Sequence, residues 1–535
     1  MRDPQRRNQG NSLATSVPHV GELNFLRILK RGLMFADGRA LVDLAKGHDV
    51  TYGQHIDRVT QLIGALRGLG ITSSDRIGVL AGSCHEYIEL WHACLSGTAI
   101  INPLNSRLAA EEYVYILNDS GTTTLFVDAT FAGMINDIRP RLEHLRTVVL
   151  IGDADAPHDL RYDALMAAQP VGTLPEEPDD DAPAVLMYTG GTTGLPKGVV
   201  LQQKAIVLVT YRSQMGMLIE PGWRYLAFMP LFHVGSIMTW SLLIPNGGTV
   251  FLLPAFEPKA VMNAVRDHRI TAIAGVPTMF GLIVHHPDFE PSMFESLTLM
   301  GYGAAPMPDA LLARYMALYP NLSFFQAYGM TEFAATVCAL TPHDHRVGGE
   351  ILKSVGRPCI GVEVEIRHPE TMETVPAGEV GELWIRCDSA MLGYWNKPDA
   401  TEKALVGGWY RSGDAGRIDD NGYVFLADRV KDMIVSGGEN VYSLEVENAI
   451  ASHPAVTQVA VVGRPHEIWG EAVHAFVVCA PNGVTEAELD AHARATIAGY
   501  KVPKSWTLQS EPLPLSGAGK ILKRDLRERL LNDAR

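Results

Sequence analysis

The sequence predicts an α/β fold built on a mostly parallel sheet, followed by a separate small α+β domain. Three observations support this prediction. The chain has 535 residues, more than one compact core accommodates, so two or more domains are expected. Strand-like and helix-like segments alternate through residues 22–120, which favours a parallel sheet with helices on both faces. Residues 431–535 carry strands and helices of their own.

Apolar residues at helical spacing predict the helices, and short apolar runs between turns predict the strands. In chain order we expect a helix at 52–69, a strand at 75–81, a helix at 86–94, a strand at 99–103, a helix at 108–117 and a strand at 125–128. Near the end of the chain we expect helices at 444–451 and 485–497, and strands at 456–462 and 472–478.

Composition narrows the class of protein. The formal net charge of −15 argues against wholesale nucleic-acid binding. Six cysteines without paired or metal-ligand spacing predict reduced thiols in a cytoplasmic protein. No apolar run approaches the length of a membrane span. The oligomeric state stays open, a homodimer included.

Two charged segments are predicted to be solvated. Residues 1–20 read as a disordered tail, and a weak peripheral contact of nearby basic residues with a membrane surface is the alternative. These basic residues are Arg2, Arg6, Arg7, Arg27, Lys30 and Arg31. The acidic stretch 176–181 reads as a solvated connector.

The most informative stretch is Tyr-Thr-Gly-Gly-Thr-Thr-Gly-Leu-Pro-Lys-Gly-Val, residues 188–199. Glycines allow close backbone approach, so successive N–H groups and hydroxyls can wrap a polyphosphate, and Lys197 adds a positive charge. Apolar strands are predicted at 183–188 and 199–201, on both sides of the loop. A Walker P-loop would instead continue with Ser or Thr and open a helix. The sequence therefore predicts a different kind of phosphate loop.

Further polar residues suit contacts with a nucleotide or a metal ion. Glu332 comes directly after a predicted strand, and beside a phosphate a carboxylate is a natural Mg²⁺ ligand. One carboxylate, such as Asp414, can accept from two vicinal ribose hydroxyls, and Arg429 suits a ribose or phosphate contact. His233 and Lys520 by themselves read as a structural histidine and a surface lysine.

Together these segments resemble the adenylate-forming enzymes, which include acyl-CoA synthetases, firefly luciferase and peptide-synthetase adenylation domains. The loop 188–199, Pro-x-Phe-His at 230–233, Tyr-Gly-Met-Thr-Glu at 328–332 and Gly-Lys at 519–520 match in the family's order, with Gly190 in place of its serine. The resemblance implies an N-terminal AMP-binding domain of stacked sheets at 21–430. A small mobile domain at 431–535, a hinge at Lys431 and an active site in the cleft between the domains are also implied.

The resemblance also implies substrates and roles. ATP and a carboxylic acid, with Mg²⁺, give an acyl-adenylate, which CoA then converts to a thioester. Lys520, Lys197 and His233 are the implied catalytic residues, and Glu332 and Thr189 the implied metal ligands. The remaining ATP or AMP contacts implied are Gly190, Gly191, Thr192, Thr193, Gly303, Ala304, Ala305, Gln326, Ala327, Tyr328, Thr331, Asp414 and Arg429. Ser436, Gly437 and Gly438 are implied to contact CoA.

The acid is the least defined part of this prediction. The implied acyl pocket is apolar and is formed by His233, Val234, Gly235, Ile237, Met238, Gly329 and Met330. Relatives that use acetate carry a tryptophan where Gly329 stands, so we expect open space beyond this glycine. A medium- or long-chain fatty acid fits best. An aryl or alicyclic acid, transfer to a carrier protein, a luciferase-like oxidase and a non-catalytic binding protein are the alternatives.

Overall fold

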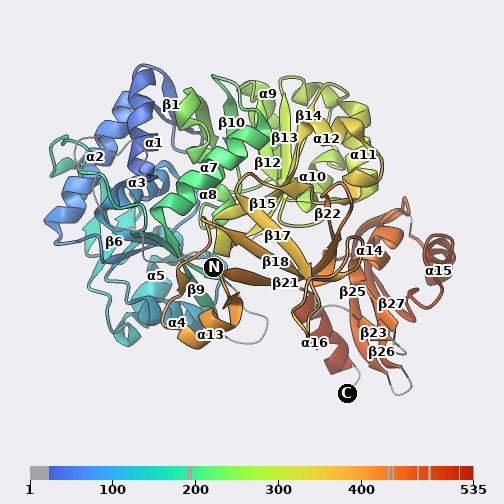
Figure 1. Ribbon diagram of the computed structural model, residues 1–535. Helices are drawn as coiled ribbons and strands as arrows, with labels where there is room; N and C mark the ends of the chain where they lie inside the picture. Colours follow the sequence, from blue (N-terminus) through green and yellow to red (C-terminus); the bar gives the residue numbers. More distant parts are fainter. Residues whose placement is uncertain are drawn as a thin grey trace, which may run out of the picture.

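The computed structural model describes residues 23–189, 195–429, 434–436, 439–466, 469–479, 483–516 and 519–533. Within these residues the strands form four sheets (Figure 1). Three sheets are built from residues before 430, and the fourth from residues 434–509. The elements after residue 433, orange to red in Figure 1, gather at one side of the molecule.

The largest sheet has the order β16-β15-β14-β13-β12-β10-β11-β1-β2. Its strands from β14 to β1 run parallel, whereas β2, β15 and β16 pair antiparallel at the two ends. The strands are β1 (Arg39–Asp43), β2 (His48–Thr51), β10 (Arg224–Ala227), β11 (Thr249–Leu252), β12 (Ala272–Gly275), β13 (Leu299–Gly303), β14 (Ser323–Met330), β15 (Ala335–Leu340) and β16 (Arg357–Pro358).

The second sheet has the order β19-β9-β8-β4-β3-β5-β6-β7. Only β9 and β19 run antiparallel to their neighbours. The strands are β3 (Arg76–Leu80), β4 (Ile100–Pro103), β5 (Thr124–Asp128), β6 (Thr147–Ile151), β7 (Leu160–Arg161), β8 (Pro183–Thr189), β9 (Lys197–Gln202) and β19 (Gly393–Tyr394).

Two smaller sheets complete the described strands. The third is antiparallel and contains β17 (Val362–Arg367), β18 (Gly381–Cys387), β20 (Leu405–Val406), β21 (Trp409–Ile418) and β22 (Val424–Arg429). The fourth contains β23 (Ile434–Ser436), β24 (Glu439–Val441), β25 (Val456–His466), β26 (Gly470–Cys479) and β27 (Ser505–Gln509), of which β27 joins parallel to β26.

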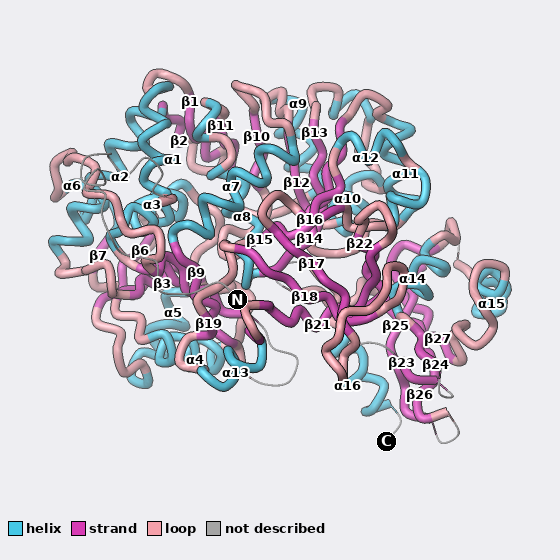
Figure 2. The backbone as a smooth tube through the Cα atoms, in the orientation of Figure 1, coloured by secondary structure: helices cyan, strands magenta, loops and turns pink. Residues whose placement is uncertain are grey.

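Helices separate and cover the sheets (Figure 2). The main core joins inner faces of the first two sheets through α1 (Phe25–Arg31), α2 (Tyr52–Gly68), α3 (His85–Ala93), α7 (Gln203–Met217) and α8 (Val234–Ser241). The outer face of the first sheet packs on α9 (Pro258–Asp267), α10 (Pro277–Val284) and α11 (Asp309–Leu318). The outer face of the second packs on α4 (Ala110–Ser120) and α5 (Ala129–Ile138). The other helices are α6 (Tyr162–Ala167), α12 (Pro342–Val347), α13 (Pro398–Ala404), α14 (Ser443–Ala451), α15 (Glu486–Arg494) and α16 (Lys523–Asp533).

The α/β class and the alternation of elements are confirmed. The predicted helix at 52–69 is α2, and it begins at Tyr52 because Thr51 and Gln54 form a reciprocal cap. The predicted strands on both sides of the phosphate loop are β8 and β9. The predicted domain boundary at 430/431 lies outside the described residues and stays a prediction.

The acidic connector is not simply solvated, which corrects one expectation. Glu177 accepts from Lys30 at 2.8 Å and from Arg27 at 2.6 Å, both in α1. The hydrogen bond from Lys30, with that from Arg27, lowers the pKa of Glu177 to about 2 although burial opposes the shift. Two of the basic residues considered for a membrane contact are therefore engaged within the chain.

Among the described residues, no helix combines the length and the apolar character needed to cross a bilayer. All six cysteines are free thiols, and Cys84, Cys94 and Cys338 are buried.

Candidate functional site

The β8–β9 hairpin holds the ends of the predicted phosphate loop together. Thr189 and Lys197 are paired across the hairpin, and the Thr189 hydroxyl lies 3.5 Å from the Lys197 carbonyl. A Cβ on Gly198 would come within 2.8 Å of the Leu186 side chain and 3.0 Å of the Tyr188 ring, so a larger residue after the lysine would have to displace these side chains. The loop residues Gly190, Gly191, Thr192 and Thr193 lie outside the described residues.

Lys197 and Glu332 are joined through one tyrosine that the sequence analysis did not single out. The Tyr394 hydroxyl donates to Glu332 Oε1 at 2.9 Å, and the Lys197 ammonium lies 4.9 Å from the centre of the Tyr394 ring. Tyr410 lies 3.3 Å from the Tyr394 hydroxyl. Burial, followed by the negative charge of Glu332, raises the pKa of both tyrosines. Neutral hydroxyls therefore orient the carboxylate.

Glu332 fits the role of a Mg²⁺ ligand. It lies in a short 3₁₀ helix, Thr331–Phe333, that packs against β9, the strand beginning with Lys197. A carboxylate has about four acceptor positions, so the bond from Tyr394 leaves capacity for a cation. Mg²⁺ usually takes one or two carboxylates together with water and substrate phosphates. No distance places the Thr189 hydroxyl on the same ion, so its role as a ligand stays a prediction.

The predicted adenine contacts lie on neighbouring parallel strands. Gly303 at the end of β13 pairs with Ala327 in β14. A Cβ on Gly303 would lie 2.4 Å from the Ala327 carbonyl oxygen, so no larger residue fits. Ala304 follows with φ +63°, a left-handed conformation that is uncommon for alanine. Gln326 is buried, and Ala305 is partly exposed beside Ala304.

The two predicted ribose residues occupy paired positions on neighbouring strands. Asp414 in β21 pairs with Arg429 in β22. The Tyr328 hydroxyl donates to Asp414 Oδ2 at 2.6 Å, which ties β14 of the first sheet to β21 of the third. Burial leaves Tyr328 only 9% exposed. The fold therefore brings Asp414 beside the predicted adenine strand, 86 positions away in the sequence.

His233 and Lys520 are far apart in the sequence, and the turn that carries Lys520 contacts the N-terminal part of the chain. His233 directly precedes α8. Burial, followed by the positive charges of Lys520 and Arg107, lowers the pKa of His233 to about 4. Lys520 lies on a turn whose neighbour Gly519 accepts a hydrogen bond from Thr278 at 3.3 Å. Lys197 and His233 thus lie on the N-terminal part, and Lys520 lies on a turn that contacts this part through Thr278.

The predicted acyl residues differ in how deeply they are buried. Val234 and Ile237 are buried in the main core. Apart from its chain neighbours and the backbone of α8 itself, no described atom lies within 4 Å of the position that a Cβ would take on Gly235, so open space borders this residue. Met330 is partly buried against the core, and nothing is described for the Met238 side chain.

The open space expected beyond Gly329 is absent, which corrects that part of the prediction. A Cβ on Gly329 would lie 1.5 Å from the Ala335 carbonyl oxygen. The register of β14 and β15 shifts after Tyr328, and Ala335 has φ +120°. This bulge turns backbone toward Gly329, so Gly329 is needed for strand packing, whatever acid is bound.

The predicted CoA contact at Ser436 ends β23, where the residue pairs with Glu439 and Gly470. Gly437, Gly438 and the predicted hinge Lys431 lie outside the described residues.

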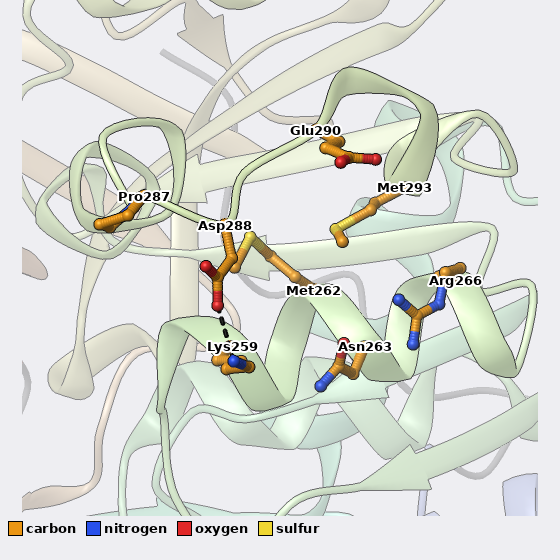
Figure 3. A pocket seen from close by; sticks show the side chains of 8 residues that line it. All are labelled: Lys259, Met262, Asn263, Arg266, Pro287, Asp288, Glu290 and Met293. Atoms are coloured by element: carbon orange, nitrogen blue, oxygen red, sulfur yellow. Dashed lines mark hydrogen bonds and ion pairs between the residues drawn. The ribbon is translucent and has the colours of Figure 1, made fainter.

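Two cavities can be compared with these residues. One of about 610 Å³ borders Lys197, Tyr394, Tyr410 and Arg411, so it adjoins the predicted phosphate site. Another of about 390 Å³ lies between α9 and residues 287–293, where Lys259 pairs with Asp288 at 2.6 Å (Figure 3). No predicted site residue lines the second cavity.

A buried charged cluster contains none of the predicted site residues. His85 Nδ1 lies 3.2 Å from Asp43 and 3.3 Å from Glu86, which also binds Lys46. Its spacing would suit a metal ion. Glu86 is already paired with Lys46, and Glu89 with Arg58, so we read the cluster as a structural ion-pair network.

Comparisons with known proteins agree with this geometry. The AMP-binding enzyme family matches residues 30–395, and the AMP-binding enzyme C-terminal domain matches residues 445–520. A feruloyl-CoA synthase from Amycolatopsis sp is 38% identical over 486 residues, which are 90% of this chain and 94% of that protein. The fatty acid–[acyl-carrier-protein] ligase ScoC from Streptomyces coeruleorubidus is 34% identical over 497 residues, 92% of this chain and 93% of that protein.

A solved structure extends the comparison to the whole fold. The crystal structure of the anthranilate CoA ligase AuaEII in complex with anthranoyl-AMP has a TM-score of 0.90 at 27% sequence identity. The match covers 96% of this chain and 98% of that one. The chain therefore belongs to the family of AMP-binding enzymes and is an adenylate-forming ligase of the kind that uses CoA or a carrier protein as acyl acceptor.

Proposed function

We propose that this protein is an AMP-forming acyl-CoA synthetase whose acid is a medium- or long-chain fatty acid. In the first step a carboxylate oxygen attacks the α-phosphorus of ATP, and the bond from that phosphorus to pyrophosphate breaks. In the second step the sulfur of CoA attacks the acyl carbon, AMP leaves with its carboxylate-derived oxygen, and the thiol proton passes to water. The observation that carries the proposal is the docking of the turn that carries Lys520 on the N-terminal part, where the Thr278 hydroxyl donates to the Gly519 carbonyl at 3.3 Å.

The residues supply what an anion attacking an anion requires. Lys197 and Lys520 are cations that would stabilise negative charge growing on the phosphate in the transition state. Bound on Glu332, Mg²⁺ would neutralise phosphate charge. Asp414, held by Tyr328, would accept from the ribose hydroxyls. His233 is neutral at pH 7, since its pKa is about 4, and would line the mouth of the acyl site without repelling Lys520.

The fatty-acid part of the proposal rests on the surroundings of Gly235. This residue borders open space, and its neighbours Val234 and Ile237 are apolar and buried. An alkyl chain in apolar surroundings gains about 0.8 kcal/mol per methylene, roughly fourfold in binding for each carbon. ScoC, whose name states a fatty-acid substrate, supports the same class.

An aryl acid is the second candidate. It is favoured by the feruloyl-CoA synthase at 38% identity and by the likeness to an anthranilate CoA ligase. Open space beside Gly235 would accommodate a ring as well as an alkyl chain.

A panel of acids separates the candidates. The chain would be given ATP, Mg²⁺ and CoA with acetate, octanoate, dodecanoate, palmitate, benzoate or ferulate, and AMP and the thioester would be measured. We expect kcat/KM to climb from acetate to dodecanoate and then to level off. A preference for acetate, or high activity on benzoate and ferulate with no dependence on chain length, would refute the fatty-acid proposal and leave the ligase intact.

A test variant and its matched control show whether the open space beside Gly235 sets the chain-length preference. Gly235→Leu should move the preference toward shorter acids because it fills the open space. Gly133→Leu is the matched control, because Gly133 also has open space at its Cβ position but lies exposed on α5.

A phosphopantetheinylated carrier protein in place of CoA tests the acceptor: transfer to the carrier alone would reassign the enzyme as a carrier-protein ligase.

A further inference from the structure

The turn that carries Lys520 is fixed within its own part of the chain. Ser516 N–H donates to the Lys520 carbonyl at 2.6 Å, and Leu522 N–H donates to the Pro514 carbonyl at 2.8 Å. The Lys520 N–H donates to the Ser516 hydroxyl at 3.1 Å. Leu513 is buried in the small core formed with β25 and β26. These contacts attach the turn to the part of the chain that forms the fourth sheet.

Two donors from the N-terminal part bind backbone carbonyls of this turn. The Arg107 guanidinium donates to the Ser516 carbonyl at 3.0 Å. Thr278 is the second residue of α10, and its hydroxyl donates to the Gly519 carbonyl at 3.3 Å. The two accepting carbonyls belong to the residues four and one positions before Lys520.

The fit around Gly519 is close. Gly519 has φ +75°, and a Cβ there would lie 3.0 Å from Val276 Cγ2 and 3.7 Å from the Thr278 hydroxyl. The glycine therefore lies directly on the loop between β12 and α10. The backbone at Gly519 is therefore held against this loop. This contact limits the positions that the side chain of the next residue, Lys520, can reach.

We propose that Arg107 and Thr278 are positioning residues that dock the Lys520 turn on the N-terminal part for adenylate formation. The proposal rests on the proposed function, because Lys520 must act in the first half-reaction. A lysine has a flexible four-carbon side chain, so its ammonium is placed only if its backbone is held. Two hydrogen bonds hold the turn weakly enough to be released before the second half-reaction.

The test uses the full chain and the acid of the panel that turns over fastest, dodecanoate in the expected case. Thr278→Val removes the donor and keeps the shape, and Thr278→Ser keeps the donor. We expect Thr278→Val to lower single-turnover pyrophosphate release by roughly threefold to tenfold, the effect of one lost hydrogen bond, and Thr278→Ser to recover it. Thioester formation from supplied acyl-adenylate and CoA should stay unchanged in both variants.

A Lys520→Ala background shows whether Thr278 acts through the lysine. In that background Thr278→Val should cause no further loss, because the group that it positions is gone. Arg107→Gln gives a second variant of an exposed residue, with the same expected loss of pyrophosphate release and the same lack of effect in Lys520→Ala.

Three results would overturn the inference: an unchanged rate in Thr278→Val and Arg107→Gln, an equal loss in both half-reactions, or an additive loss in the Lys520→Ala background. Failure of the proposed function would look different. In that case the wild-type chain itself would release no pyrophosphate with any acid of the panel.

Discussion

Replacing Tyr328 by phenylalanine removes one hydroxyl and keeps the ring that we place beside adenine. The lost group donates to Asp414 Oδ2 at 2.6 Å, and Tyr328 is 9% exposed. A hydrogen bond to a charged group contributes about 1.5–3 kcal/mol, and about 1.4 kcal/mol is tenfold. If Asp414 needs this bond to face the ribose, kcat/KM for ATP should fall roughly tenfold to a hundredfold.

The assay compares ATP with 2′,3′-dideoxy-ATP, using pyrophosphate release. The wild-type chain should discriminate strongly against the dideoxy nucleotide, and Tyr328→Phe should discriminate much less, because both changes disable the same contact. Tyr315→Phe is the matched control: it removes a buried hydroxyl that donates to the Phe280 carbonyl, away from Asp414. Equal discrimination in Tyr328→Phe and the wild type would refute the role that we give to Asp414.

Other changes give separate outcomes. Lys520→Ala should lower adenylate formation by orders of magnitude and largely spare thioester formation from supplied acyl-adenylate; equal losses would contradict its assignment. The same variant should raise the pKa of His233 above about 4, since one repelling charge is gone, and NMR titration of the histidine would show an unchanged value if the two are not neighbours. Gly329→Ala should lower the melting temperature and the activity on every acid, because its Cβ would overlap the Ala335 carbonyl oxygen; a stable variant with altered chain-length preference would restore the open-space expectation. Glu177→Gln should lower stability to urea above pH 4.5, the usual pKa, and the difference from wild type should vanish as the pH falls toward 2, the pKa in the folded chain; a constant difference would exclude the charge of Glu177 as its cause.

Local patterns predicted the elements well. The apolar runs on both sides of the loop at 188–199 became β8 and β9, and the pattern at 456–478 became β25 and β26. In each case adjacent residues decide the outcome, because a short continuous apolar run forms a strand buried over most of its length. The motifs likewise placed Lys197 and Glu332 close together, linked by Tyr394.

Contacts between distant segments could not be predicted. From the sequence, Gly329 is expected to border open space, but in the structure the bulge between β14 and β15 turns the Ala335 carbonyl toward it. A single sequence does not show this cross-strand register. Tyr394 gives no signal of its own, because a tyrosine after a glycine fits any strand. The pairing of Glu177 with α1 spans about 150 positions.

The central claim is that the carboxylate attacks the α-phosphorus of ATP at this site. The most direct measurement supplies the acid with ¹⁸O in both carboxylate oxygens, together with ATP, Mg²⁺ and CoA, and analyses the AMP by mass spectrometry. We expect each AMP formed to carry one heavy oxygen in its phosphate and the thioester to retain the other. AMP without heavy oxygen, or ADP in place of AMP, would contradict the claim.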